Sequence, residues 1–251
     1  MEEFEGPLWV RVGGGLEHVP SGDRHGPADA AFPPPGGPWE PLIHNGRLVG
    51  FAEGPNRNLA RRAGEIGERI TGERRAYLLG RLGHKLRSAL LALQESARGA
   101  AFGRHEALEQ VYEQAQEVGR RAAAVEAAAI DPVDQARAVV LGALMNLAAP
   151  AADRRELPED AVVRAPESVL VEAMTRTYEW MGGEGVRITG ERFGGWWRLM
   201  FAAPSDRRPL AVPEFGEPLV RFLIDTHLDG WLDASDPDVA IVYLPAHEVD
   251  M

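Results

Sequence analysis

Residues 77–97 read YLLGRLGHKLRSALLALQESA, and this stretch decides the fold. Its apolar residues recur at steps of three and four, the spacing of one buried stripe along an α-helix. No proline occurs between residues 57 and 130, so nothing interrupts helical structure over that range. The predicted stripe comprises Ile66, Ile70, Tyr77, Leu79, Leu82, Leu86, Leu90, Leu93 and Ala97 on a first helix, and Leu108, Val111, Ala115, Val118, Ala122, Val125 and Ala129 on a second.

A short break separates the two predicted helices. Residues 98–105 read RGAAFGRH, and a connection of this length predicts an antiparallel hairpin. A single hairpin would leave much of its apolar stripe in water, so we expect two copies to pair as a dimeric four-helix bundle. The alternative is that the hairpin packs on the C-terminal domain of its own chain.

The segment that precedes the hairpin is rich in glycine and proline. Residues 33–38 read PPPGGP, a composition that long helices do not tolerate. Apolar and β-branched residues at 8–12 and 46–54 predict short strands, with a turn at residues 44–46. We interpret residues 1–56 as a small β and loop segment, part of a sensory module or a capping module.

The segment that follows the hairpin alternates between helical and strand patterns. The adjacent Trp196 and Trp197 lie in a strand, where alternation predicts one in the core and one at an edge. The predicted elements are helices at 133–148, 168–180 and 218–228, and strands at 186–190, 196–200 and 239–244. Helices on one face of a mixed or antiparallel sheet make an α/β sandwich. The chain is therefore expected to be an α+β protein with domains at 1–56, 57–130 and 131–251.

Charge and composition exclude several classes of function. Asp and Glu number 38 against 27 Lys and Arg, a net charge of -11, which argues against nonspecific binding to nucleic acid or anionic membranes. The absence of cysteine excludes disulfides, Cys-based zinc sites and thiol nucleophiles. The seven histidines show no metal-binding spacing, so no metal site is expected. The acidic start MEEFEG and the lack of a long apolar run predict a cytoplasmic protein.

One histidine lies within the deciding stretch. His84 follows Leu82 and precedes Leu86 by two residues, which places it about 200° around the helix from both. The imidazole should therefore point away from the buried stripe, and a neutral ring nitrogen near pH 7 is a competent phosphoryl acceptor. The alternative is an ordinary solvated surface histidine.

Residues 83–90, GHKLRSAL, resemble the phosphoacceptor box of two-component sensor histidine kinases. Four positions match, His84, Leu86, Arg87 and Leu90, and Ser88 replaces threonine. The resemblance continues through residues 163–201 and 216–245, which are similar to the kinase ATPase domain. It implies a homodimeric signalling protein that docks a response-regulator receiver domain. By the same resemblance His84 would accept phosphate, Arg87 would steady the phosphoryl oxygens, and Ser88 would orient a water molecule or contact the receiver.

The sequence departs from this family at the positions that bind ATP. Lys85 replaces the acidic residue after the histidine, and Glu172 and Arg176 replace asparagines of the ATPase domain. Residues 203–207 align with the loop that binds adenine in the family, but they lack its aspartate and glycines. The second glycine-rich motif of the family is reduced to residues 216–218. Residues 208–215 are too few for a long lid over the nucleotide. Magnesium-nucleotide binding needs oxygen ligands and flexible backbone N–H groups, so we expect no cofactor and no ATP-dependent kinase activity. The expected function is that of a degenerate kinase acting as a histidine phosphotransferase.

Two alternatives remain open from the sequence. The first is a divergent but active kinase that uses Glu172, Asp206 or Glu217 to bind magnesium. The second is a regulatory adaptor that is not phosphorylated, in which His84 is vestigial.

Overall fold

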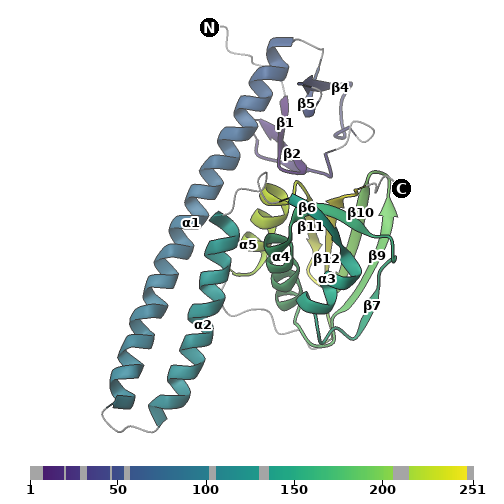
Figure 1. Cartoon of the computed structure of the whole chain (residues 1–251). Coiled ribbons are helices and arrows are strands. Elements are labelled where there is room, and N and C mark those ends of the chain that lie inside the picture. Colours follow the sequence, from purple (N-terminus) through teal and green to yellow (C-terminus); the bar gives the residue numbers. More distant parts are fainter. Residues whose placement is uncertain are drawn as a thin grey trace. The chain divides into compact units, whose positions relative to one another are not determined.

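The computed structural model describes residues 8–19, 21–28, 33–45, 47–53, 57–101, 106–129, 136–205 and 215–247 (Figure 1). Its mixture of helices and sheets confirms that part of the expected fold class. The chain divides into two compact units, one of Met1–Arg74 with Asp131–Met251 and one of Arg75–Ile130. The long helix α1, Arg57–Ala101, contributes its first turns to the former and the remainder to the latter.

The N-terminal residues form a five-stranded antiparallel sheet in the order β3-β2-β1-β5-β4. The strands are β1 Leu8–Val12, β2 Gly15–Val19, β3 Arg24–His25, β4 Trp39–His44 and β5 Arg47–Glu53. The two predicted strands of this segment are confirmed as β1 and β5. Asn45 lies between β4 and β5 with a left-handed backbone (φ 50°), in the predicted turn. Gly46, also in that turn, lies outside the described residues.

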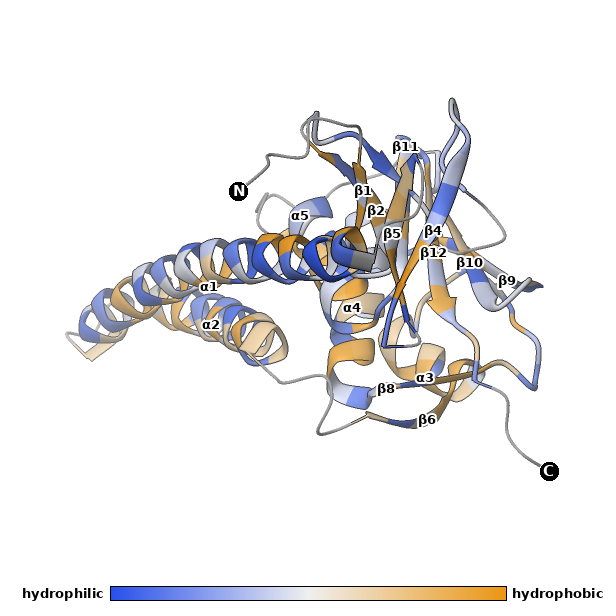
Figure 2. Cartoon of the chain, turned by 90° about the horizontal axis from the view of Figure 1, so that it is seen from above, coloured by the Kyte–Doolittle hydropathy of each residue, from blue (hydrophilic) through white to orange (hydrophobic). Residues whose placement is uncertain are grey.

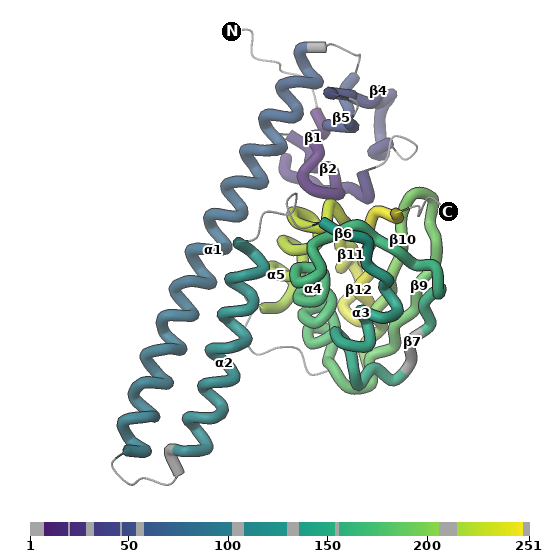
Figure 3. Tube along the Cα trace, viewed as in Figure 1, coloured from purple at the N-terminus to yellow at the C-terminus, as the bar shows by residue number. Residues whose placement is uncertain are grey.

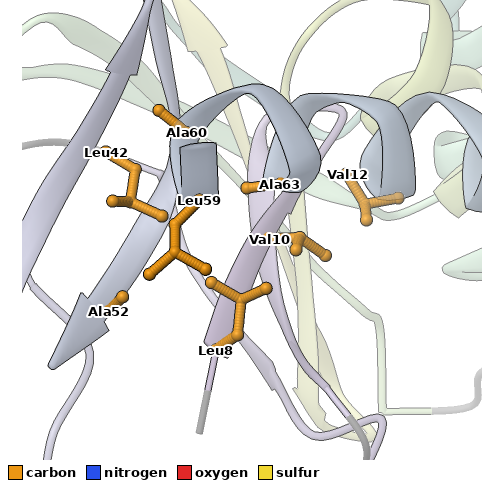
Figure 4. Close-up of a cluster of buried hydrophobic side chains, with 8 residues drawn as sticks. All are labelled: Leu8, Val10, Val12, Leu42, Ala52, Leu59, Ala60 and Ala63. Atoms are coloured by element: carbon orange, nitrogen blue, oxygen red, sulfur yellow. The ribbon is translucent and has the colours of Figure 1, made fainter. Parts of the chain in front are cut away.

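One face of this sheet packs on the beginning of α1 (Figure 4). Alternate side chains of β1 share this face, as the pleat of a strand requires. The buried cluster consists of Leu8, Val10, Val12, Leu42, Ala52, Leu59, Ala60 and Ala63. Ile66 and Ile70 pack against the same cluster. The first two residues of the predicted helical stripe therefore cover the sheet, which corrects the expectation that they belong to a helix-to-helix seam.

In the second unit, α1 and α2, Glu106–Ala129, run antiparallel (Figure 3). Two hydrogen bonds set their alignment: Arg75 Nη2 donates to Ala129 O at 2.7 Å, and Arg121 Nη1 donates to Lys85 O at 2.8 Å. The first helix extends to Ala101, further than the predicted break at 98–105, and residues 102–105 lie outside the described part of the chain. No described helix carries an apolar stretch long enough to cross a bilayer.

The surface of α2 that meets α1 differs from the predicted apolar stripe. Ala124 and Ala128 are buried, whereas Ala115 and Ala122, which belong to the stripe, are exposed. Large stripe residues are exposed too, with Tyr77 at 66%, Leu90 at 48% and Leu108 at 58%. Figure 2 shows hydrophobic and hydrophilic positions interspersed along both helices. A single hairpin therefore leaves part of its apolar stripe uncovered.

The C-terminal part contains a second five-stranded sheet in the order β11-β12-β10-β9-β7. Its strands are β7 Arg154–Glu156, β9 Arg187–Phe193, β10 Trp196–Ala202, β11 Trp231–Asp236 and β12 Val239–Pro245. Only β7 is parallel to its neighbour, so the sheet is mixed. The predicted hairpin is confirmed, because β9 and β10 pair across Gly194 and Gly195. The predicted strand at 239–244 is confirmed as β12.

Helices α4 and α5 lie on the same side of this sheet (Figure 1). The elements here are α3 Leu141–Ala148, α4 Glu167–Trp180, α5 Glu217–Phe222 and a π-helical turn, η2 Leu223–His227. The helix predicted at 168–180 is confirmed as α4, with Val169, Leu170, Ala173, Met174 and Thr177 buried as expected. The helix predicted at 218–228 is confirmed in position, although its second half is π-helical.

Two predictions for the C-terminal part are wrong. Residues 136–140, expected within a helix, form strand β6, Ala136–Val140, which pairs with β8, Val162–Pro166, so that the helix begins only at Leu141. The β-branched Val139 and Val140 face Val163 and Val162 in this ladder, a pairing between distant segments that outweighs the local helical pattern. The second wrong prediction concerns the two tryptophans, of which one was expected at an edge. Both Trp196 and Trp197 are buried, and the indole N–H of Trp197 donates to Val162 O at 3.0 Å.

Candidate functional site

His84 lies within α1, with its side chain exposed. Its position on a long regular helix fixes the direction of its Cα–Cβ bond. Ser88, one turn further on, donates its hydroxyl to His84 O at 3.1 Å, so this hydroxyl is held along the helix axis. Arg87 is exposed as well.

A cavity of about 370 Å³ lies between α1 and α2 beside this histidine. The lining residues are His84, Lys85, Ser88, Ala89 and Ala92 from α1 and Gln114, Glu117 and Arg121 from α2. Two of the predicted site residues, His84 and Ser88, therefore meet at one cavity, whereas Arg87 is not among its lining residues. Small alanines opposite longer polar side chains leave this space open.

Arg121 and Glu117 form a braced pair on the α2 side of the cavity. Arg121 Nε donates to Glu117 Oε1 at 2.5 Å, and its Nη1 donates to Lys85 O at 2.8 Å, directly after His84 in the chain. Glu117 Oε2 also accepts from Arg120 at 2.5 Å. Charge-assisted bonds of this kind hold a guanidinium in a fixed place. The lining carries two cations, Lys85 and Arg121, against one carboxylate, and so favours an anionic group next to the imidazole.

The α2 side of this cavity was missed by sequence reasoning. Gln114 and Arg121 each precede a residue of the predicted apolar stripe, Ala115 and Ala122, and so lie off that stripe. One available signal was the spacing of Glu117 and Arg121, four residues apart with opposite charges, which identifies a helical ion pair. That spacing does not show which helix the pair faces.

A second group of charged residues lies on α4, at the positions where the kinase family has asparagines. The side chain of Arg176 is only 3% exposed, and it forms ion pairs with Glu172 Oε1 and Glu179 Oε2, both at 2.7 Å. Its guanidinium also lies over the Phe215 ring, 5.1 Å from the ring centre. Burial raises the pKa of Glu172, and the nearby Arg176 opposes that rise. The Glu172 carboxylate is thus already neutralised by a cation of this chain.

Of the two remaining candidate magnesium ligands, Glu217 lies within the described residues and Asp206 does not. Glu217 Oε1 accepts from Arg221 Nη2 at 2.6 Å, one helical turn away. Asp206 lies outside the described residues, as do the other residues up to 214. Among the residues that are described, no three His, Asp or Glu side chains gather in a way that would hold a metal ion.

No family model matches this sequence, and no curated protein matches it. Solved structures do resemble the fold. Histidine kinase AdeS of Acinetobacter baumannii is 12% identical with a TM-score of 0.49, over 66% of this chain and 98% of that chain. Histidine kinase ThkA, solved in complex with response regulator protein TrrA, is 13% identical with a TM-score of 0.48, over 97% of this chain and 80% of that chain.

A histidine kinase from Burkholderia phymatum STM815 is 13% identical with a TM-score of 0.30, over 69% of this chain and 97% of that chain. All three are histidine kinases. At these identities the similarity concerns the fold alone and assigns no role to any side chain of this chain.

Proposed function

We propose that this chain is a catalytically degenerate, histidine-kinase-like signalling protein that forms a homodimer, docks a response-regulator receiver domain and relays phosphate through His84. The observation that carries the proposal is the setting of His84: an exposed imidazole on a long helix, beside a cavity with more positive than negative side chains. An incoming phosphoryl group is anionic, so this setting suits it.

The relay step needs only the imidazole and a phosphorylated partner. The lone pair of the unprotonated ring nitrogen of His84 forms the P–N bond, while the P–O bond to the aspartyl carboxyl group of the receiver breaks and its electrons leave with the carboxylate. Arg121, fixed between Glu117 and Lys85 O, supplies positive charge beside the transferring group. Arg87, exposed three residues after the histidine, is proposed to steady the phosphoryl oxygens from outside the cavity. Ser88 is proposed to contact the receiver.

Phosphotransfer to His84 can be measured directly. Receiver domains from the same genome, loaded with radiolabelled acetyl phosphate, are mixed with the full chain. We expect label that is lost in acid and kept in alkali, as for a phosphoimidazole, and no label on His84→Ala. His44→Ala is the control, because it removes a histidine from strand β4. Label that persists on His84→Ala would remove His84 from the mechanism.

Degeneracy of the ATPase-like domain is the second part of the proposal, and Arg176 supports it. A guanidinium cannot ligate a metal ion, and here it neutralises Glu172, one of the few carboxylates that could. Incubation of the chain with labelled ATP and magnesium should show neither bound nucleotide nor label on His84. Magnesium-dependent binding of ATP would instead favour the divergent, active kinase.

A regulatory adaptor is the competing function. The hydroxyl of Ser88 is bonded to the helix backbone, and Lys85 stands where the family has an acid, so His84 lacks two helpers of the transfer reaction. Full biological activity of His84→Gln, together with no label from any receiver tested, would favour the adaptor over the relay.

A further inference from the structure

The turn between β1 and β2 touches the C-terminal domain backbone to backbone. Gly14 N–H donates to Asp225 O at 3.2 Å. A Cβ atom on Gly13 would overlap Asp225 O, and one on Gly14 would overlap Gly230 O. Gly13 and Gly14 are thus explained by a close approach of two main chains, and Gly15 by the Trp231 ring, which a Cβ atom at that position would overlap.

The acceptor of this contact lies at an irregular helix end. Asp225 belongs to η2, where Leu228 N–H bonds back to Leu223 O and Gly230 N–H to Ile224 O. The last carbonyls of a helix have no donors of their own. Asp225 O receives its donor from the N-terminal sheet, and π-helical turns of this kind are frequent at functional positions.

Three arginines of the N-terminal sheet surround the contact and meet two aspartates. Arg24 pairs with Asp225, whose side chain is 5% exposed and whose other oxygen accepts from Leu232 N–H at 3.1 Å. The Arg24 guanidinium also lies 4.8 Å from the centre of the Trp231 ring. Burial raises the pKa of Asp225, an effect that Arg24 opposes.

Asp229 forms the outer part of the same contact. Its Oδ2 accepts from Arg11 Nη2 at 2.8 Å and from Arg47 Nη2 at 2.6 Å. Asp229 has a left-handed backbone (φ 53°), a conformation that favours glycine. Aspartate is less favourable than glycine in this backbone conformation, but its carboxylate forms the two ion pairs. We therefore attribute the aspartate at this position to the contact between the sheet and the C-terminal domain.

The β1–β2 hairpin also contacts α1. Glu17 pairs with Arg74, and a Cβ atom on Gly67 would overlap Arg11 O. The carbonyl of Arg11 therefore touches α1 while its guanidinium reaches Asp229. Any movement of this hairpin would act on both partners.

We infer that the glycine turn with Arg11, Arg24 and Arg47 forms an intramolecular latch that fastens the N-terminal sheet to residues 225–231 of the C-terminal domain. A change in the sheet then reaches the C-terminal domain directly through the latch, in parallel with its path through α1. The latch stands apart from the proposed relay, because none of its residues lines the cavity beside His84.

Gly14→Ala tests the latch with a single methyl group. Gly14 lacks the left-handed backbone of Gly13, and the atoms that an added Cβ would overlap, Asp229 O and Gly230 O, belong to the C-terminal domain. We expect the backbone amide at position 14, measured by NMR, to exchange with solvent roughly tenfold faster or more than in the wild type. Because the chain has no cysteine, spin labels at Glu40→Cys and Ser235→Cys report the sheet-to-domain distance, which should change from a narrow to a broad distribution. Gly195→Ala, where a Cβ atom meets nothing within 4 Å, is the control.

A second variant keeps the test decisive if Gly14→Ala does not fold. Asp229→Gly removes both outer ion pairs and relieves the left-handed backbone, so its fold should be retained. Faster exchange of the Gly14 amide and a broader label distance are expected here too. Unchanged exchange and an unchanged distance in a folded Gly14→Ala, or in Asp229→Gly if the first variant is unfolded, would overturn the latch.

Discussion

At the scale of single residues, the buried charge of Arg176 has both a structural and a functional consequence. The guanidinium of Arg176 forms ion pairs with Glu172 and Glu179 and lies over the Phe215 ring, so its buried positive charge is compensated. Removing one member of such a group leaves the others buried without compensation, which costs more than the pair itself contributes. The same residue therefore has a structural role and a consequence for nucleotide binding.

Arg176→Ala should lower the free energy of unfolding by about 3 kcal/mol, because Glu172 and Glu179 would lose their common partner. Urea denaturation measures this change. Arg61→Ala is the matched control: it removes an exposed partner of Glu65 on α1 and should cost less than about 1 kcal/mol. Equal losses in the two variants would show that burial of Arg176 has no energetic weight.

His25 provides a prediction on pH. Burial lowers its pKa below the ordinary value of 6.5, so the folded state keeps the ring neutral where the unfolded state takes up a proton. Stability should therefore fall as pH decreases from about 7 through 6.5 toward the folded pKa. Urea denaturation between about pH 5 and 7 should show this slope in the wild type, and a smaller one in His25→Gln. The same replacement at His44 is the control, and a slope unchanged in His25→Gln would contradict the assignment.

At the scale of secondary structure, local patterns predicted the elements that carry their own signal. Helix α4 was predicted from its apolar face, and the β9–β10 hairpin from its two-glycine turn. Each of these signals lies within the element itself. Strand β6 was misassigned because it is defined by a distant partner, β8. Partners far apart in sequence leave no periodic signal in either segment. Strand β11 was missed although its partner β12 follows directly in the chain.

In the candidate site, too, only the feature with a local signal was predicted from the sequence. His84 was placed correctly as an exposed side chain of α1, since rotation along a helix is a local property. Its companions Gln114, Glu117 and Arg121 come from α2, and the heptad pattern directed attention to the neighbouring stripe instead. Which strip of α2 meets α1 depends on the packing of both helices.

The hairpin offers a matched pair of leucines for testing this packing. Leu82 is 1% exposed and Leu91 is 57% exposed on the same helix. Leu82→Ala should destabilise the protein by about 2 to 5 kcal/mol through loss of buried contacts and a residual cavity. Leu91→Ala should stay within about 0.5 kcal/mol of the wild type in the same thermal or urea denaturation. A reversed order would mean that Leu91 faces the buried side of the hairpin.

At the scale of the whole molecule, the exposed apolar stripe raises the question of its partner. Tyr77, Leu90 and Leu108 lie in the predicted stripe and are about half or more exposed in one copy. Large apolar side chains that are exposed on a soluble domain can mark a contact surface. A second copy of the hairpin is the partner that the repeated spacing favours.

Light scattering on the purified protein should therefore give about twice the chain mass of 27.4 kDa. Leu90→Glu should shift the mass toward that of one chain, because a carboxylate would be buried in the shared seam. Gln94→Glu adds the same charge one turn away at an exposed polar position and should leave the mass unchanged. A wild-type chain that is monomeric at all concentrations would contradict the dimer.

The two alanines that line the cavity set its size, since Ala89 and Ala92 contribute only methyl groups. A leucine at either position would act as a steric filter in front of a chemically intact imidazole. Small phosphoryl donors such as phosphoramidate would still reach His84, while a protein loop would be kept out. Access and reactivity can thus be separated at this histidine by one substitution that leaves the ring itself unchanged.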